Sequence, residues 1–262
     1  MPRLRPVAHE DRLTLVEHLD ELRTRIIVSI AAFAVAFGIC FWQNDRLLNI
    51  ANQPLPGDTH PITFGVAEPF TQTVTITAYA ALIVSLPVIL YQLYAFVLPA
   101  LTERERRVIV PFLIGVPILF LIGVVFGYFV VLPPATKFLL NFNDTQFNIQ
   151  VRAQNYYSFF AVTLIAMGLI FQLPVGILAV TRLGIVTPEQ LSKNRRYAVV
   201  ILAIVAMLLP GTDPVSMLLE LIPLLLLYEG SLILARLFGR PSATEDADRD
   251  IAVSEPPPSG AA

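Results

Sequence analysis

The sequence has few charged residues and almost no cysteine or histidine. Only 15% of its 262 residues are charged and 55% are hydrophobic, whereas soluble domains typically carry about 25% charged residues. The single cysteine excludes a disulfide within the chain, and the three scattered histidines do not suggest a metal centre. A net charge of −2 does not favour a nucleic-acid partner. This composition predicts an integral membrane protein without a metal or cofactor.

The sequence also lacks the residue patterns of common catalytic sites. No glycine-rich phosphate loop is present, and no Ser-His-Asp or Glu-x-x-His arrangement lies in or beside a hydrophobic run. We therefore expect no enzymatic activity. The start of the chain mixes acids with its basic residues and is not followed by a small-residue cleavage site, so the first hydrophobic run is expected to remain as a span.

Six hydrophobic runs predict an all-α integral membrane protein with six transmembrane helices. The runs cover about 26–42, 73–98, 108–132, 157–180, 197–209 and 215–234. The fifth run is shorter than the roughly 17–25 residues that cross a bilayer core. It either thins the membrane locally or forms a shallow hairpin with the sixth run, and the turn residues Pro210, Gly211 and Pro214 favour spanning. Kinked helices are expected because prolines lie inside four of the runs. These prolines are Pro87, Pro111, Pro117, Pro174 and Pro223.

Lysine and arginine are distributed unevenly among the connections between the runs. If the N-terminus is cytoplasmic, 15 of the 18 basic residues lie on the cytoplasmic side, and only Arg46, Lys137 and Arg152 lie opposite. This bias predicts that both termini are cytoplasmic. Residues 1–25 then form a cytoplasmic segment, 26–235 the transmembrane domain, and 236–262 a disordered, acidic cytoplasmic tail.

The charged stretch "TLVEHLDELRTR" (residues 14–25) precedes the first run and predicts an amphipathic helix at the cytoplasmic membrane surface. Its leucines fall on one helical stripe. Thr14 and Glu17 fit a T-x-x-E capping box, which gives Glu17 a structural role. Glu21 and Arg25 are four residues apart and predict an intrahelical ion pair of only about 0.2–0.5 kcal/mol.

A second charged cluster, "TERERR" (residues 102–107), lies between the second and third runs. Thr102 and Glu105 again fit a capping box just before an apolar run. One role for Glu105 is therefore to cap the third helix.

Two acids, Glu220 and Glu229, lie within the sixth run, and an acid at bilayer depth is a candidate functional residue. They are nine residues apart and project from opposite helix faces, so they do not form a carboxylate pair. Glu229 is expected to reach the cytoplasmic surface or to pair with Arg236. Gln172, in the fourth run, is a possible polar partner for Glu220.

Several motifs resemble, in their order along the chain, those of the twin-arginine translocase receptor subunit, the TatC family. They are "HLDELRTR" (18–25), "VAEPF" (66–70), "PVILYQLYAFVLPALTERERR" (87–107), "YFVVLP" (128–133) and "MLLPGTDPVS" (207–216). The resemblance extends from about residue 14 to residue 240 and does not include the acidic tail.

The resemblance implies a function as well as a fold. The fold would be a concave six-helix bundle in the cytoplasmic (inner) cell membrane, with shallow fifth and sixth helices. The protein would be a core subunit of the twin-arginine translocation system that binds the twin-arginine signal peptides of folded cargo proteins. With small single-span partner subunits of the TatA/TatB type, in a hetero-oligomer of several copies, it would transport this cargo using the proton-motive force.

The resemblance also implies site residues, position by position. Those implied to bind the signal peptide are Glu21, Arg23, Phe96 and Glu105. Asp213 matches a functional aspartate of the outer turn, and Met207 and Leu208 match positions linked to partner docking.

One departure from the family pattern concerns the membrane interior. Many members have a glutamate in the fourth span where this chain has Gln172, whereas Glu220 stands where an apolar residue is common. We hypothesise that Glu220 supplies the polar group inside the concavity. The alternative function is a proton-coupled small-solute transporter, which Glu220 and the kinked helices would suit. That class usually shows internal repeats, and none is visible in this sequence.

Overall fold

The computed structural model describes residues 15–57, 59–97, 103–146, 149–182, 185–208 and 214–238. The side chains of 15–18, 97, 103–114, 182 and 238 are not described. Thr14, Thr102, Asp213 and the acidic tail from residue 239 onward also lie outside the described part. Both proposed capping boxes and the predicted disorder of the tail therefore stay predictions.

The regular secondary structure of the described chain is helical, apart from one bridging pair between Ile62 and Arg152. The elements are α1 (Leu15–Trp42), α2 (Asn44–Asn52), α3 (Glu68–Val97), α4 (Glu103–Phe126), the π-helix η2 (Gly127–Val131), α5 (Leu132–Asn141), α6 (Ala153–Ile170), α7 (Leu173–Arg182), α8 (Pro188–Lys193), α9 (Arg195–Leu208) and α10 (Pro214–Phe238).

The predicted all-α membrane fold is confirmed. Five described segments are long and apolar enough to span a membrane: Leu19–Trp42, Glu68–Phe96, Gly115–Asn141, Ala153–Thr181 and Pro214–Leu237. The sixth candidate, α9, has 14 residues and covers about 21 Å, so the six-span count stays a prediction. By contrast, α10, which contains the sixth run, has 25 residues and extends over about 37 Å, long enough to cross a bilayer core.

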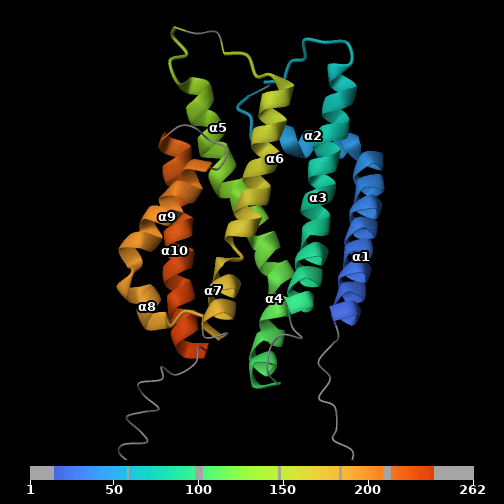
Figure 1. Ribbon diagram of the computed structural model, residues 1–262. Coiled ribbons are helices and arrows are strands. Elements are labelled where there is room, and N and C mark those ends of the chain that lie inside the picture. The colour runs from blue at the N-terminus through green and yellow to red at the C-terminus, as the bar shows by residue number, and fades with distance from the viewer. Residues whose placement is uncertain are drawn as a thin grey trace, which may run out of the picture.

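The long helices lie side by side and alternate in direction (Figure 1). The described chain ends, Leu15 and Phe238, lie at the same end of the bundle, together with the C-terminal end of α3 and the start of α4. We call this the inner end, because it holds the residues predicted to be cytoplasmic, and the opposite end the outer end. Helix α1 packs chiefly on α3, and α10 packs on α7 and α9.

Two of the spans are interrupted just before a proline, and the kinks expected at the other prolines stay predictions. The third span passes from α4 through η2 before Pro133, and the fourth breaks at Phe171 and Gln172 before Pro174. A proline ring conflicts with the carbonyl four residues earlier, and a π-turn or a break relieves that conflict. The other predicted prolines lie inside continuous helices: Pro87 in α3, Pro111 and Pro117 in α4, and Pro223 in α10.

A short helix that the hydrophobic pattern did not predict, α2, covers the outer end between α1 and α3. Distant tyrosines and a threonine hold it and the turn that follows. Tyr156 donates to the Ala51 carbonyl (2.5 Å), and Tyr128 donates to that of Ile50 (2.9 Å). Thr136 Oγ donates to the Pro54 carbonyl (3.0 Å). These side chains donate to backbone carbonyls at the end of α2 and in the turn that follows it, where the regular donors of a continuing helix are lost.

Helices α4 and α6 approach each other backbone to backbone. A Cβ atom at Gly123 would lie 2.6 Å from the Met167 carbonyl oxygen, and one at Gly168 would lie 2.4 Å from the Phe120 ring. Phe120 and Met167 are fully buried at this contact. Small residues at helix interfaces are a main source of association energy in lipid, because they allow such close packing. The α4–α6 contact is therefore the tightest backbone approach that the described glycines show.

We expect Gly123→Ala to lower the thermal stability of the purified protein, because the added methyl group overlaps the α6 backbone. Overpacking of this kind costs roughly 1–3 kcal/mol. The control is Gly115→Ala in the same helix, where a Cβ meets nothing within 4 Å. The control should be neutral or slightly stabilising, since alanine favours helices over glycine. Equal losses of melting temperature for both variants would refute this account of the contact.

Candidate functional site

At the inner end, Glu21 is held by Arg25 within α1. Arg25 Nε donates to Glu21 Oε1 at 3.1 Å, and its Nη2 donates to the same oxygen. This confirms the ion pair that the four-residue spacing predicted. Both side chains are partly exposed, Arg25 at 22% and Glu21 at 27%, and such exposed pairs stabilise a fold only weakly.

A third residue, Gln92 of α3, joins this pair. Arg25 Nη1 donates to Gln92 Oε1 at 3.2 Å, so the guanidinium bridges the two helices. Sequence reasoning missed Gln92. The signal available was its place as a lone amide in the apolar stretch "VILYQLYAFV", since an amide within a span usually has a polar partner.

An apolar cavity of about 250 Å³ lies beside the bridge, between α1 and α3. Leu22, Ile26, Leu93 and Phe96 are among its lining residues, together with Arg25. The structure thus brings Phe96 and the Glu21–Arg25 pair to the same interhelical site. Arg23 lies two residues from Glu21, and its side chain is exposed.

The other implied site residues fall at several places. Glu105 is the third residue of α4, which begins at the inner end near the end of α3 (Figure 1). Met207 and Leu208 are the last residues of α9, at the outer end, and both are exposed. Asp213, which directly precedes α10, lies outside the described residues. The described site residues that the resemblance implies therefore lie at both ends of the bundle.

Gln172 and Glu220 are both buried, with exposed fractions of 7% and 1%. Gln172 lies at the break between α6 and α7, and Glu220 lies in α10. The predicted partnership between them is wrong: Gln172 Nε2 donates to the Val116 carbonyl of α4 at 3.1 Å. Gln172 lies where the helix is interrupted between α6 and α7, and its amide reaches α4 instead of α10.

The predicted pairing of Glu229 with Arg236 is also wrong. Glu229 pairs with Arg195 of α9 (3.1 Å), and Arg236 donates to the Ser192 hydroxyl of α8 (2.8 Å). Both residues lie on α10, but the packing of α8 and α9 against α10 brings competing partners to both side chains. These contacts tie the inner connection between the fourth and fifth spans to α10.

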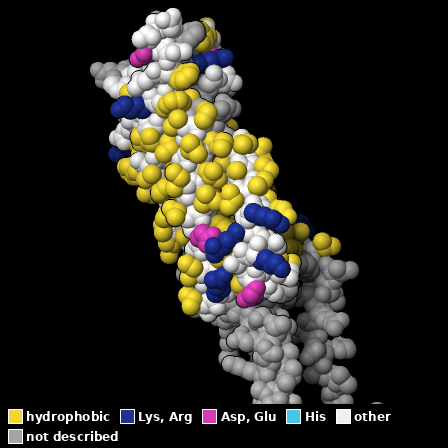
Figure 2. All heavy atoms as spheres, turned by 90° about the vertical axis from the view of Figure 1, so that its left-hand side faces the viewer, with side chains coloured by type: hydrophobic (Ala, Val, Ile, Leu, Met, Phe, Trp, Pro, Cys, Tyr) yellow, Lys and Arg dark blue, Asp and Glu magenta, His cyan; other side chains and the backbone are white. Residues whose placement is uncertain are grey.

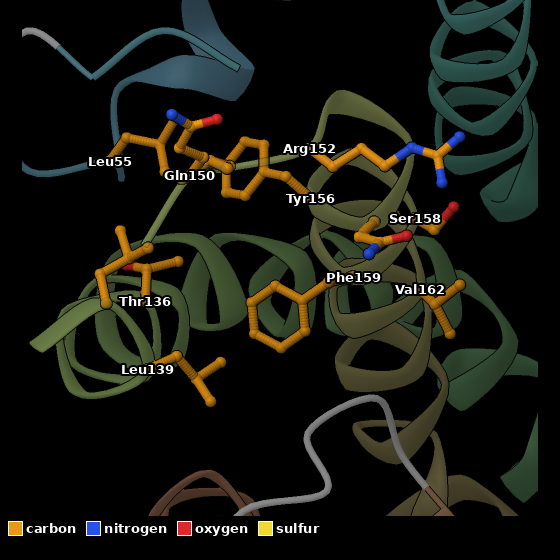
Figure 3. A pocket seen from close by; sticks show the side chains of 12 residues that line it. Leu55, Thr136, Leu139, Gln150, Arg152, Tyr156, Ser158, Phe159 and Val162 are labelled. Atoms are coloured by element: carbon orange, nitrogen blue, oxygen red, sulfur yellow. The ribbon is translucent and has the colours of Figure 1, made fainter. Parts of the chain in front are cut away.

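A cavity of about 590 Å³ lies at the outer end between α5, α6 and the segment before α6. Figure 3 shows Leu139, Phe159 and Val162 beside it, with Tyr156 and Thr136 at its edge. Arg152 extends away from Leu55 and Leu139 (Figure 3), and its Nε donates to Glu68 at 3.2 Å. The described residues contain no cluster of His, Cys, Asp or Glu that could hold a metal ion.

The surface over α8, α9 and α10 has the charge pattern of a membrane-embedded protein. Hydrophobic side chains cover its middle, and lysine, arginine and acidic side chains gather toward its two ends (Figure 2). Together with the long apolar helices, this pattern defines a multi-pass α-helical membrane protein.

Comparison with known proteins gives the family. The family model described as "Sec-independent protein translocase protein (TatC)" matches residues 17–223. The chain is 37% identical to the TatC protein of Aquifex aeolicus over 87% of its own length and 97% of the relative's. It is also 37% identical to that of Escherichia coli K12, over 87% and 90%. The chain belongs to the TatC family.

Solved structures agree. The crystal structure titled "Twin Arginine Translocase Receptor- TatC in DDM" superimposes with a TM-score of 0.74 at 36% identity, covering 86% of this chain and 100% of the other. A second TatC crystal structure gives 0.73 at 37% identity. The protein is therefore a translocase subunit of the cytoplasmic membrane and not an enzyme.

Proposed function

We propose that this subunit binds the twin-arginine signal peptides of folded cargo at its inner end. Working with small single-span partners of the TatA/TatB type, in a hetero-oligomer of several copies, it then transports the cargo using the proton-motive force. The observation that carries the proposal is the Glu21–Arg25–Gln92 bridge beside an apolar cavity that includes Phe96. A carboxylate next to an apolar cavity suits a peptide in which arginines precede a hydrophobic segment.

The bridge supports an exchange of partners. Arginine binds carboxylates through a planar fork with two parallel hydrogen bonds. An incoming signal arginine can replace Arg25 at Glu21, while Arg25 keeps its hydrogen bond to Gln92. The exchange is inexpensive because the intrahelical pair is weak and partly exposed. We assign the second signal arginine to Glu105, on the first turn of α4, and a supporting role at the site to Arg23 and Phe96.

We expect Glu21→Gln and Glu105→Gln each to weaken binding of a fluorescent twin-arginine signal peptide to the full-length protein in nanodiscs by about tenfold or more. This estimate reflects the loss of a charge-assisted hydrogen bond of about 1.5–3 kcal/mol. The control is Asp20→Asn, which removes a neighbouring exposed acid from another face of α1. A twin-lysine peptide should bind weakly to every variant.

Photo-crosslinkers at positions 21 and 105 test contact directly, and they should label the twin-arginine peptide more than the twin-lysine one. Equal labelling by both peptides, or equal losses for Asp20→Asn and Glu21→Gln, would refute specific recognition. The melting temperature of Glu21→Gln should stay close to wild type, because its local pair is weak.

The outer end of α9 is proposed to dock the single-span partner through Met207 and Leu208, together with Asp213, which directly precedes α10 in the sequence. Cysteines at 207 and 208, in a Cys40→Ala background, should form disulfides with cysteines near the outer end of the partner helix. The control is a cysteine at Ile201, which is equally exposed (59%, against 61% for Met207) but one to two turns nearer the inner end. Equal cross-linking at 201 would contradict docking at the outer end.

Glu220 is proposed to supply the polar group of the membrane interior in place of a fourth-span glutamate. We expect Glu220→Leu to reduce export of a twin-arginine reporter several-fold. Gln172→Leu should have a smaller effect, because the Gln172 amide donates only to the backbone of α4. Immunoblots should show equal membrane levels of both variants. Normal export with Glu220→Leu, combined with loss for Gln172→Leu, would reverse the assignment.

The alternative, a proton-coupled small-solute transporter, makes a different prediction for the same protein. It requires proton-driven solute uptake by liposomes that contain this chain alone. The translocase requires partner subunits, and its cargo export stops when a protonophore collapses the proton-motive force.

A further inference from the structure

Lysine and arginine side chains gather toward the inner end of the face shown in Figure 2, and three exposed cations lie on α8, α9 and α10. Lys193 ends α8, Arg196 is the second residue of α9, and Arg236 lies in the last turn of α10. We call these three residues the basic cluster. It lies on different elements from the Glu21–Arg25–Gln92 bridge and takes no part in the proposed function.

The backbone that carries the basic cluster is fixed by several contacts. The Tyr228 hydroxyl donates to the Leu191 carbonyl at 3.0 Å, and Arg236 donates to the Ser192 hydroxyl at 2.8 Å. A reciprocal capping box between Thr187 and Gln190 defines the start of α8. The cations therefore project from a connected platform of three elements rather than from a loose loop.

Within the part of the chain that the structure describes, the positive charge of the cluster is not neutralised by ion pairs. Arg195, next to Arg196, is paired with Glu229. Among the described residues, no carboxylate forms an ion pair with Lys193, Arg196 or Arg236. The Arg196 guanidinium instead stacks on Tyr197, 4.9 Å from the ring centroid. Glu189, in the first turn of α8, is the acidic residue of this connection. The three cations of the basic cluster outnumber it, so the surface attracts an anion.

The residues next to the cluster indicate which kind of anion it would bind. Beyond Tyr197, α9 is apolar, and Val200, Ile201 and Ile204 are exposed on its surface. A helix of 14 residues extends only about 21 Å, so its basic end is drawn toward the hydrocarbon. In Figure 1, α8 and the start of α9 lie nearer the middle of the bundle than the inner end of α4.

We propose that the basic cluster binds the phosphate of an anionic phospholipid of the inner leaflet, whose acyl chains lie along the exposed apolar face of α9. Guanidinium groups bind phosphate oxygens in two-point fashion, and lysine adds a point charge. Cations next to a membrane surface attract anionic lipids in general. A lipid suits this place better than an acidic peptide, because the apolar face continues directly from the cations.

The test compares two double variants that each remove one lysine and one arginine: Lys193→Gln/Arg196→Gln at the cluster and Arg46→Gln/Lys137→Gln at the outer end. Arg46 and Lys137 are exposed, and the described chain shows no ion pair for either. The purified full-length protein is titrated with phosphatidylglycerol or phosphatidylcholine in detergent, and bound lipid is counted by native mass spectrometry.

We expect wild type and the outer-end variant to retain phosphatidylglycerol at least fivefold better than phosphatidylcholine, and the cluster variant to lose that preference. The charge-preserving Lys193→Arg/Arg196→Lys should keep it, and unchanged melting temperatures without lipid exclude misfolding. Millimolar inorganic phosphate should not displace the lipid.

Three results would overturn the proposal. The cluster variant could keep the preference for phosphatidylglycerol, both double variants could lose that preference, or the charge-preserving variant could lose it. Loss of partner-subunit binding with unchanged lipid retention would instead identify a protein-binding surface. No cargo is present, so the outcome is independent of signal-peptide recognition.

Discussion

The close approach of α4 and α6 is the contact on which the rest of the bundle depends. In lipid, helices gain little from burying apolar surface, so they associate by packing and by hydrogen bonds. Gly123 and Gly168 bring the two backbones within direct contact, and the span that contains α6 is the most buried of the five. Helix α3 packs on α4 and α6, and α7, which continues from α6, packs on α10. The other helices take their positions from this pair.

The periphery of the bundle is different, and function concentrates there. Helix α1 packs chiefly against α3, and only 6% of the residues in the apolar part of its span are buried. The Arg25 bridge to Gln92 and the adjoining cavity lie at this contact. A peripheral helix with few buried residues can exchange polar partners without disturbing the core, because few buried contacts depend on it. The proposed signal site therefore belongs to the margin of the bundle, whereas Gln172 and Glu220 belong to its interior.

Sequence patterns predicted the elements better than their partners. The first run was expected to end at Trp42, and α1 ends there. The Glu21–Arg25 pair was also predicted correctly, since both residues share one helix. Sequence reasoning missed α2, which is held by tyrosines from distant helices. Pairing with Arg236, one of the two roles that sequence reasoning left open for Glu229, is wrong, because packing of α9 against α10 supplies Arg195.

The sequence by itself determined the membrane environment, the long helices and the uneven distribution of basic residues. These follow from the length of the apolar runs and from local spacing, since a chain in lipid must satisfy its backbone hydrogen bonds within each helix. Only the tertiary structure decided which side chains meet across helices: Arg25 with Gln92, Gln172 with Val116, and Arg195 with Glu229. Those choices depend on how closely two helices pack and at what register, and residues far apart in the chain set both.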